Sequence, residues 1–230
     1  MNLQKTLSQA WSLQVKIIEI LRTLKSLHDK AEAEKAKRDE QTDKKQSALE
    51  AEQSAQRREK DLEAQIEKST RIRTRTQSLL ESGQIVDVDS AQEQIDALTA
   101  QLESLEEEFL ECLEEQDRQR EAQLRYANFI ELYTRSHREA VQVFQERNPV
   151  LTADREDLEE EIEKLLFPCS DKIRDHFEAY KFKHPQLVVA LKASYCGYCS
   201  NRLPLDLVSE IRNTTNVYRC STCRAFCIAD

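Results

Sequence analysis

The feature of this sequence that most limits its fold is the scarcity of glycine and proline. The 230 residues contain two glycines and four prolines, and residues 1–82 contain neither. A compact domain changes direction often, and its turns depend on glycine, proline, asparagine or aspartate to reach their backbone angles. Charged residues make up 33% of the chain, as is typical of long helices and coiled coils. The sequence therefore predicts a mostly α protein that buries a seam and not a large core.

Two tracts of the chain repeat apolar residues at coiled-coil spacing. In such a repeat, every third or fourth side chain faces a partner helix. The first tract carries Leu3, Leu7, Ala10, Gln14, Ile17, Leu21, Leu24, His28 and Ala31. The second carries Ile95, Leu98, Leu102, Leu105, Phe109, Cys112, Gln116, Gln119, Gln123, Tyr126, Ile130, Tyr133, His137, Ala140 and Phe144. Two such tracts predict two long helices that pack along their length.

Helix stop and start signals lie between these tracts. Gly83 stands where a helix commonly ends in a left-handed residue. Ser90 followed by Glu93 has the pattern of a capping box, and Asp87 adds negative charge near the positive end of the second helix. A turn near 83–90 therefore predicts an antiparallel hairpin, in which residue i lies opposite roughly residue 172 − i.

Proline marks the expected end of the second arm. Asn148-Pro149 predicts a break near 148–152, because proline lacks a backbone donor and clashes with the preceding turn. Pro168 ends the segment that follows, and Ser170 is a candidate cap for a last helix that reaches about Tyr180. The expected domains are a helical hairpin over 1–180 and a small domain over 185–230.

The middle of the hairpin pairs unlike side chains. Within residues 28–61 alanines stand where leucines would be expected, and the facing part of the second tract carries Tyr126, Phe129, Ile130 and Tyr133. These large residues either fill the space that the alanines leave, or lie partly exposed and form a surface for a partner or for a homodimer.

The C-terminal segment contains two Cys-x-x-Cys pairs separated by twenty residues, Cys196 with Cys199 and Cys220 with Cys223. Two tight turns of this kind can direct four thiolates at one ion, the pattern of a structural zinc site. "LVVALK" and "NVYRC" before the two pairs are strand candidates. The expected domain is a β zinc ribbon with one Zn²⁺. Four sulfur ligands leave no position for a water, which argues against catalysis.

The remaining cysteines suggest no second site. Cys227 could replace Cys223 as a ligand, or it could pack as a small apolar residue beside Phe226 and Ile228. Cys112 lies on the seam, where it is most simply a core residue. Seven cysteines, four of them in metal-binding pairs, suit a reducing compartment, so the expected location is cytoplasmic.

Charge and hydropathy argue against several classes of function. The net charge of −9 is the wrong sign for wrapping nucleic acid or for binding an anionic membrane surface. No stretch approaches the roughly 18 to 20 apolar residues of a membrane span, and the N-terminus lacks a signal peptide pattern. No phosphate loop, zinc-protease motif or nucleophile elbow is present, so we expect no enzymatic activity.

The segment "SDKIRDHFEAYKFKHPQLVVALKASYCGYCSNRLPLDLVSEIRNTTNVYRCSTCRAFCI" resembles the bacterial four-cysteine zinc-ribbon and coiled-coil-hairpin family, and is most similar to its chlamydial member. The resemblance carries over Cys196, Cys199, Cys220 and Cys223 as zinc ligands. It implies a chaperone-like or scaffolding role with the alternative sigma factor sigma-54 and with flagellar or type III secretion components. Relatives tend to have glycine before the second cysteine and after the last, where this chain has Tyr198 and Arg224.

These features favour a non-enzymatic adaptor that binds other proteins. The alternative is a regulator that binds RNA or DNA through the ribbon, where Tyr195, Tyr198 and Tyr218 could stack on bases. Residues 192–230 carry five basic and three acidic side chains, which is a weak electrostatic basis for that alternative. A third candidate is a structural spacer that binds no partner.

Overall fold

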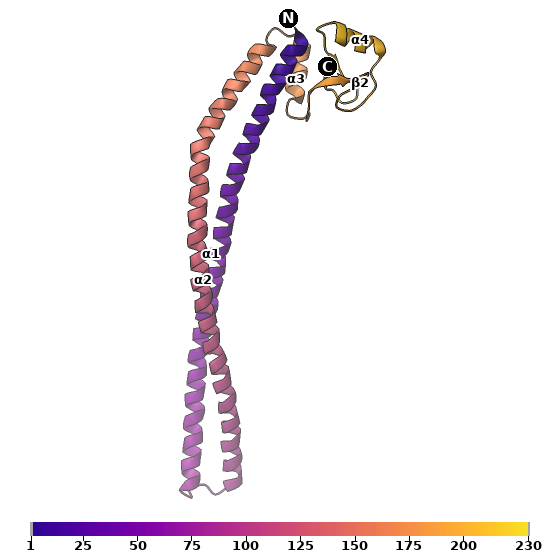
Figure 1. Cartoon of the computed structure of the whole chain (residues 1–230). Helices are drawn as coiled ribbons and strands as arrows, with labels where there is room; N and C mark the ends of the chain where they lie inside the picture. The colour runs from indigo at the N-terminus through magenta and orange to yellow at the C-terminus, as the bar shows by residue number, and fades with distance from the viewer. Residues whose placement is uncertain (1, 230) are drawn as a thin grey trace. The chain divides into compact units, whose positions relative to one another are not determined.

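The computed structural model describes residues 2–229 and shows two long antiparallel helices followed by a small C-terminal module (Figure 1). Helix α1 spans Leu3–Glu81 and helix α2 spans Val88–Leu166. A short helix, α3 (Asp171–Tyr180), leads into a four-stranded sheet that holds the cysteine pairs. The predicted fold class, a mostly α hairpin with a small C-terminal β module, is confirmed.

The two long helices pack along the predicted seam. In α1, the buried side chains include Leu7, Ala10, Gln14, Ile17 and Ala31. His28, which the sequence also placed on the seam, is exposed. Every predicted seam position of α2 is buried or half-buried. The predicted register also holds, because Arg120 donates to Glu52 at 2.8 Å and the ring of His28 lies edge-on to Phe144 at 5.9 Å.

The turn between the helices confirms one prediction and corrects another. Gly83 has a φ of +68°, and the N–H groups of Gly83 and Gln84 donate to the carbonyls of Leu80 and Leu79. This is the Schellman pattern of a helix that ends in a left-handed residue. The predicted capping box at Ser90 is wrong. Helix α2 begins earlier, because the Asp87 carboxylate accepts a hydrogen bond from the Ser90 backbone N–H at 3.1 Å.

The predicted break near 148–152 is also wrong, since α2 continues through Pro149 to Leu166. Proline already has a helical φ, and its damage is limited to one missing N–H and crowding against the carbonyl of Gln145. Both Gln145 and Pro149 lie on the exposed side of the helix. Water can therefore bond the carbonyl that loses its partner, and seam packing on the other side keeps the helix continuous.

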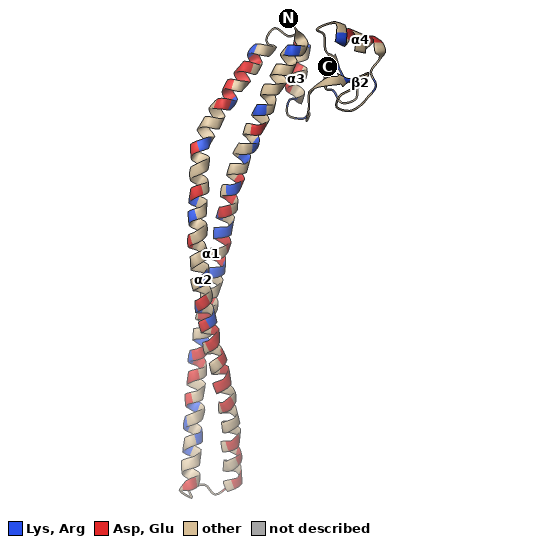
Figure 2. Ribbon diagram, in the orientation of Figure 1, with Lys and Arg blue, Asp and Glu red and all other residues tan. Residues whose placement is uncertain are grey.

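The chain folds into two compact units, and Glu32–Glu139 forms one of them. Its seam contains small residues of α1, Ala48 and Ala55, and larger residues of α2, Leu105 and Cys112. Basic and acidic residues are spread along both long helices, and acidic residues are dense on α2 near the turn (Figure 2). Of the four large residues, Tyr126, Ile130 and Tyr133 are half-buried, as packing against alanines predicts. Phe129 is 45% exposed and stacks on Tyr133 at 6.4 Å between ring centroids.

The other unit joins the N-terminal part of α1, up to Ala31, to the chain from Ala140 onward. One apolar core runs through it. The buried members of this base core are Leu7, Ala10, Trp11, Ile17, Ile162, Leu166, Cys169, Phe177, Leu187, Val188 and Phe226. Because the core includes side chains of α1, α2, α3 and the sheet, the C-terminal module is packed into the base of the hairpin.

Helix α3 has the predicted bounds. Ser170 occupies its N-cap position with an extended backbone, although its side chain accepts no capping hydrogen bond. His176 and Phe177 are the buried residues of this helix. Among residues 2–229, no helix combines the length and the apolar character needed to cross a membrane.

Candidate metal centre

A four-stranded sheet in the order β2-β1-β4-β3 positions the two cysteine pairs. Its strands are β1 (Val188–Lys192), β2 (Tyr195–Cys196), β3 (Tyr218–Arg219) and β4 (Phe226–Ile228). The pairs β1–β2 and β3–β4 are antiparallel, whereas the central pair β1–β4 is parallel. Each Cys-x-x-Cys turn therefore lies beside an antiparallel pair, and the central strands bring the two turns together.

The structure brings the four predicted cysteines to one point. The sulfur atoms of Cys196, Cys199, Cys220 and Cys223 all lie within 4.8 Å of one another. The Sγ atoms of Cys196 and Cys223 are 3.7 Å apart, and those of Cys199 and Cys220 are 3.6 Å apart. All four thiols are free, without a disulfide. A tetrahedral ion with sulfur ligands at about 2.3 Å requires sulfur–sulfur distances of roughly 3.8 Å, so the cluster fits a metal ion.

The two cysteine turns have the same backbone hydrogen bonds. In the first, the N–H of Ser200 donates to the carbonyl of Cys196 at 3.0 Å. In the second, the N–H of Arg224 donates to the carbonyl of Cys220 at 2.9 Å. Ser200 and Arg224 each follow the second cysteine of their pair, and both have left-handed backbones, with φ of 56° and 70°. The repeated geometry presents two thiols from each turn to the same point.

Arg224 occupies the position where members of the family that this segment resembles tend to have glycine. The left-handed backbone of Arg224 explains that preference. A left-handed residue with a side chain is strained by about 1–2 kcal/mol, which glycine avoids. We expect Arg224→Gly to stabilise the metal-loaded module by about 0.5–1 kcal/mol after the greater chain entropy of glycine is subtracted. Chelator competition and denaturation would measure this gain. Arg224→Ala keeps the strain, so an equal gain from alanine would contradict the explanation.

Gly197, within the first cysteine turn, is required for a different reason. A Cβ atom at this position would lie 2.1 Å from the carbonyl oxygen of Ala190 in the neighbouring strand β1. That oxygen is backbone and cannot move without separating β1 from β2. We expect Gly197→Ala to destabilise the module by about 1–3 kcal/mol and to weaken metal binding, as measured by chelator competition.

Gly83 provides the matched control for that substitution. An added Cβ there meets nothing within 4 Å, so Gly83→Ala introduces only the strain of its φ of +68°. Its expected effect is about 1 kcal/mol on the hairpin, with metal affinity unchanged. Equal loss of metal affinity in both variants would refute the steric role of Gly197.

The thiols differ in how readily they ionise before a metal binds. Burial opposes ionisation of Cys196, but the backbone N–H groups of Cys199 and Tyr198 stabilise its thiolate and, with the nearby thiols, lower its pKa to about 7. Burial raises the pKa of the Cys223 thiol to about 12. Since a metal takes thiolates, binding must displace protons from the cluster, and affinity should fall as the pH is lowered.

Cys227 lies outside the four-sulfur cluster. It is fully buried in β4, among the apolar side chains of Val189, Leu191 and Ile211. Burial raises the pKa of its thiol well above the ordinary value. Its thiol also lies within hydrogen-bond range of Cys196. Because its sulfur is not among the four that converge, the structure favours the interpretation as a small apolar side chain.

Two polar side chains that sequence analysis missed attach the module to the helices. His176 of α3 donates from Nε2 to the carbonyl of Arg224 at 2.7 Å, and its ring packs edge-on against Phe226. Burial lowers the pKa of His176, so the neutral ring is favoured. Gln4 of α1 donates to the carbonyls of Ile211, Thr214 and Asn216 and accepts from the N–H of Ala229. No sequence motif marks either residue.

The fold and the site together define a helical hairpin with a C-terminal four-thiol module that could hold one metal ion. No family model matches the chain, and no curated protein matches its sequence. Solved structures with this fold include the HP0958 protein from Helicobacter pylori, with a TM-score of 0.74, 14% identity, and coverage of 98% of this chain and 96% of that one. The CT398 protein from Chlamydia trachomatis has a TM-score of 0.77 and 13% identity, with coverage of 99% of this chain and 97% of that one. A protein from Mycobacterium smegmatis has a TM-score of 0.52 and 18% identity, with coverage of 99% of this chain and 97% of that one. At these identities the likeness is one of fold.

Proposed function

We propose that this chain is a non-enzymatic adaptor in which one Zn²⁺ holds the C-terminal module in shape for binding other proteins. The observation that carries the proposal is the convergence of four thiol sulfurs in a module whose core continues into the hairpin base. A site with four sulfur ligands is closed, so the metal stabilises the fold and offers no position for a substrate.

The donor set favours zinc over other ions. Four sulfurs in tetrahedral arrangement suit Zn²⁺ or an iron centre, whereas magnesium and calcium require oxygen ligands. Zn²⁺ has no redox chemistry, which suits a structural role in a module of this size. The four cysteines Cys196, Cys199, Cys220 and Cys223 would hold it, and the ion would supply folding energy to the surrounding turns.

An exposed apolar strip on α2 supports the adaptor role. Its members Leu124, Phe129 and Leu132 are 68%, 45% and 55% exposed. Large apolar side chains grouped on an otherwise charged helix are typical of protein-binding surfaces. The family resemblance suggests sigma-54 and components of flagellar-type secretion as partners, in a chaperone-like role in the cytoplasm. A second copy of the chain is another partner that such a strip could bind.

The test is direct binding of the full-length, metal-loaded chain to purified sigma-54 and to purified secretion-apparatus proteins. We expect at least one of them to bind and Leu132→Asp to weaken the complex at least tenfold. Asn128→Asp adds the same charge at a nearby exposed polar position and should leave binding intact. Failure of every candidate, together with a monomeric chain in sedimentation, would support the spacer and overturn the adaptor.

Binding of nucleic acid is the second candidate, and one observation favours it. Tyr195 and Tyr198 beside the first cysteine turn are each 44% exposed, so their rings are accessible for stacking. If the module uses them in this way, RNA or DNA should bind with an affinity that falls steeply with salt and is lost in Tyr198→Ala. Protein partners that survive nuclease treatment would favour the adaptor.

A further inference from the structure

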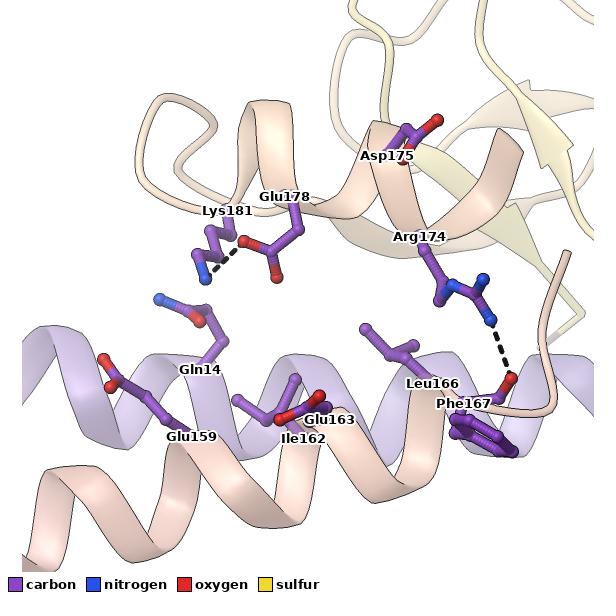
Figure 3. Close-up of a pocket in the computed structure, with 10 residues that line it drawn as sticks. All are labelled: Gln14, Glu159, Ile162, Glu163, Leu166, Phe167, Arg174, Asp175, Glu178 and Lys181. Atoms are coloured by element: carbon purple, nitrogen blue, oxygen red, sulfur yellow. Dashed lines mark hydrogen bonds and ion pairs between the residues drawn. The ribbon is translucent and has the colours of Figure 1, made fainter. Parts of the chain in front are cut away.

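A cavity of about 660 Å³ lies in the base unit between the paired helices and α3. Figure 3 shows Gln14 of α1 on the same side of the cavity as Ile162 and Leu166 of α2. Glu178 of α3 and Lys181, the residue after α3, face them. This cavity is separate from the four-thiol site, and its walls come from three helices. It is therefore a built recess, whose shape depends on how α3 packs against the hairpin.

Gln14 is the feature that points to a ligand. The residue is only 1% exposed, yet its Nε2 atom has no hydrogen-bond partner among residues 2–229. An unpaired buried polar group destabilises a fold by about 1–3 kcal/mol, so such groups are rarely left alone. A side-chain amide both donates and accepts, and its natural complement is another amide, such as a peptide bond.

The charge around the cavity indicates which peptide it would take. Four carboxylates and two cations line the cavity: Glu159, Glu163, Asp175, Glu178, Arg174 and Lys181. Both cations are already engaged. Lys181 pairs with Glu178 at 2.6 Å, and Arg174 pairs with Asp171 and donates to the carbonyl of Phe167.

The carboxylates are not neutralised to the same extent. The side-chain carboxylates of Glu163 and Asp175 form no ion pair or hydrogen bond among residues 2–229, and the four carboxylates and two cations of the lining leave an excess of negative charge. The apolar side chains of Ile162, Leu166 and Phe167 lie beside these acidic groups. An apolar wall next to carboxylates suits a long cationic side chain, whose carbon stem packs while its charged end is paired.

From these contacts we infer that the cavity binds a partner's peptide segment that carries a basic residue. The Gln14 amide bonds the peptide backbone, the basic side chain lies along Ile162 and Leu166, and its cationic end pairs with Glu163. This inference rests on the proposed adaptor function, since it gives the adaptor a docking point at the hairpin base. The site is distinct from the exposed apolar strip on α2, so either surface can fail without the other.

The test uses the full-length, metal-loaded chain and three blocked tripeptides, acetyl-Ala-Arg-Ala-amide and its glutamate and alanine counterparts. The side-chain NH₂ signals of Gln14, assigned by their loss in Gln14→Leu, report the site directly in a nitrogen-15 correlation spectrum. We expect the arginine peptide to shift these signals in a saturable way. The alanine peptide should bind about tenfold more weakly, and the glutamate peptide should bind weakest.

Two variants separate binding from folding. Gln14→Leu should raise the Tm by about 3 °C, because it removes an unpaired buried group, and should abolish the response of neighbouring signals to the peptide. Glu163→Gln should weaken arginine-peptide binding about tenfold with little change in Tm. Glu160→Gln is the matched control, since Glu160 lies outside the cavity and pairs with Lys164 at 2.7 Å.

The outcomes are decisive for this site. Gln14 signals that no peptide moves, or equal responses to the arginine and glutamate peptides, would overturn the inference even if sigma-54 or a secretion protein bound elsewhere. Conversely, a selective response to the arginine peptide that Glu163→Gln weakens and Glu160→Gln preserves would establish the cavity as a basic-peptide site, whichever proteins carry such a segment.

Discussion

Replacing Cys220 with serine is expected to abolish metal binding and to unfold the C-terminal module while most of the helical hairpin persists. The loss is large, because zinc contributes on the order of 10–16 kcal/mol of apparent binding energy to small cysteine-bound domains. Cys220 is fully buried, and its Sγ lies 3.6 Å from that of Cys199, so its replacement leaves three thiols at the point where the ion would bind. A chelator should have the same effect on the unmodified chain.

The extent of the unfolding shows whether the C-terminal module shares a core with the hairpin base or folds independently of it. Trp11, the single tryptophan, is 8% exposed in the base core that also contains Val188 and Phe226 of the sheet. Loss of the metal should therefore expose Trp11 and shift its emission to longer wavelength, with only a small loss of helical circular dichroism. An unchanged Trp11 spectrum in a metal-free Cys220→Ser variant would show that the base folds without the module.

Other cysteines serve as controls for this experiment. Cys112 donates from Sγ to the carbonyl of Ala55 at 2.9 Å on the seam, far from the sulfur cluster in sequence, and Cys112→Ser should keep a full complement of metal. Cys227→Ser tests the alternative in which Cys227 replaces Cys223 as a ligand, and it too should retain one metal per chain. If Cys220→Ser still bound one metal and Cys227→Ser did not, the ligand set would be wrong.

The hairpin was predictable from sequence because its determinants are local and repeated. A seam residue recurs every third or fourth position, and Gly83 is the one glycine among the first 196 residues. The two errors, at Pro149 and at Ser90, share a cause. A local signal was given more weight than the seam, whose packing keeps α2 continuous through the proline and lets Asp87 begin the helix earlier.

The cysteine cluster was equally accessible, since ligand spacing in such turns is fixed by the geometry of the ion. The sequence did not reveal helix α4 (Leu205–Asn213), which fills the interval between the pairs and buries Val208 and Ile211. Nor could it reveal Gln4 or the Gln14 cavity. Gln4 donates a hydrogen bond to Ile211, which is 207 positions away, and a contact over that separation produces no periodic pattern in the sequence.

Phe226→Ala is expected to destabilise the base unit by about 3–5 kcal/mol, the usual effect of emptying a large buried aromatic site. Phe226 is fully buried, packs edge-on to His176 at 4.9 Å between ring centroids, and joins the sheet to the base core. Urea denaturation followed by Trp11 fluorescence would measure the loss.

Phe182→Ala is the control for that measurement, because Phe182 is 57% exposed and its removal leaves no internal cavity. Its expected effect is within about 0.5 kcal/mol. Phe226→Ala leaves the four thiols unchanged, so one metal should still bind per chain under native conditions. The unfolding transition followed by Trp11 fluorescence should have its midpoint at a lower urea concentration. A variant that lost its metal with the Trp11 transition unmoved would mean that Phe226 supports only the cysteine turns. A transition that moves with the metal retained would show that the apolar core couples the module to the hairpin independently of the ion.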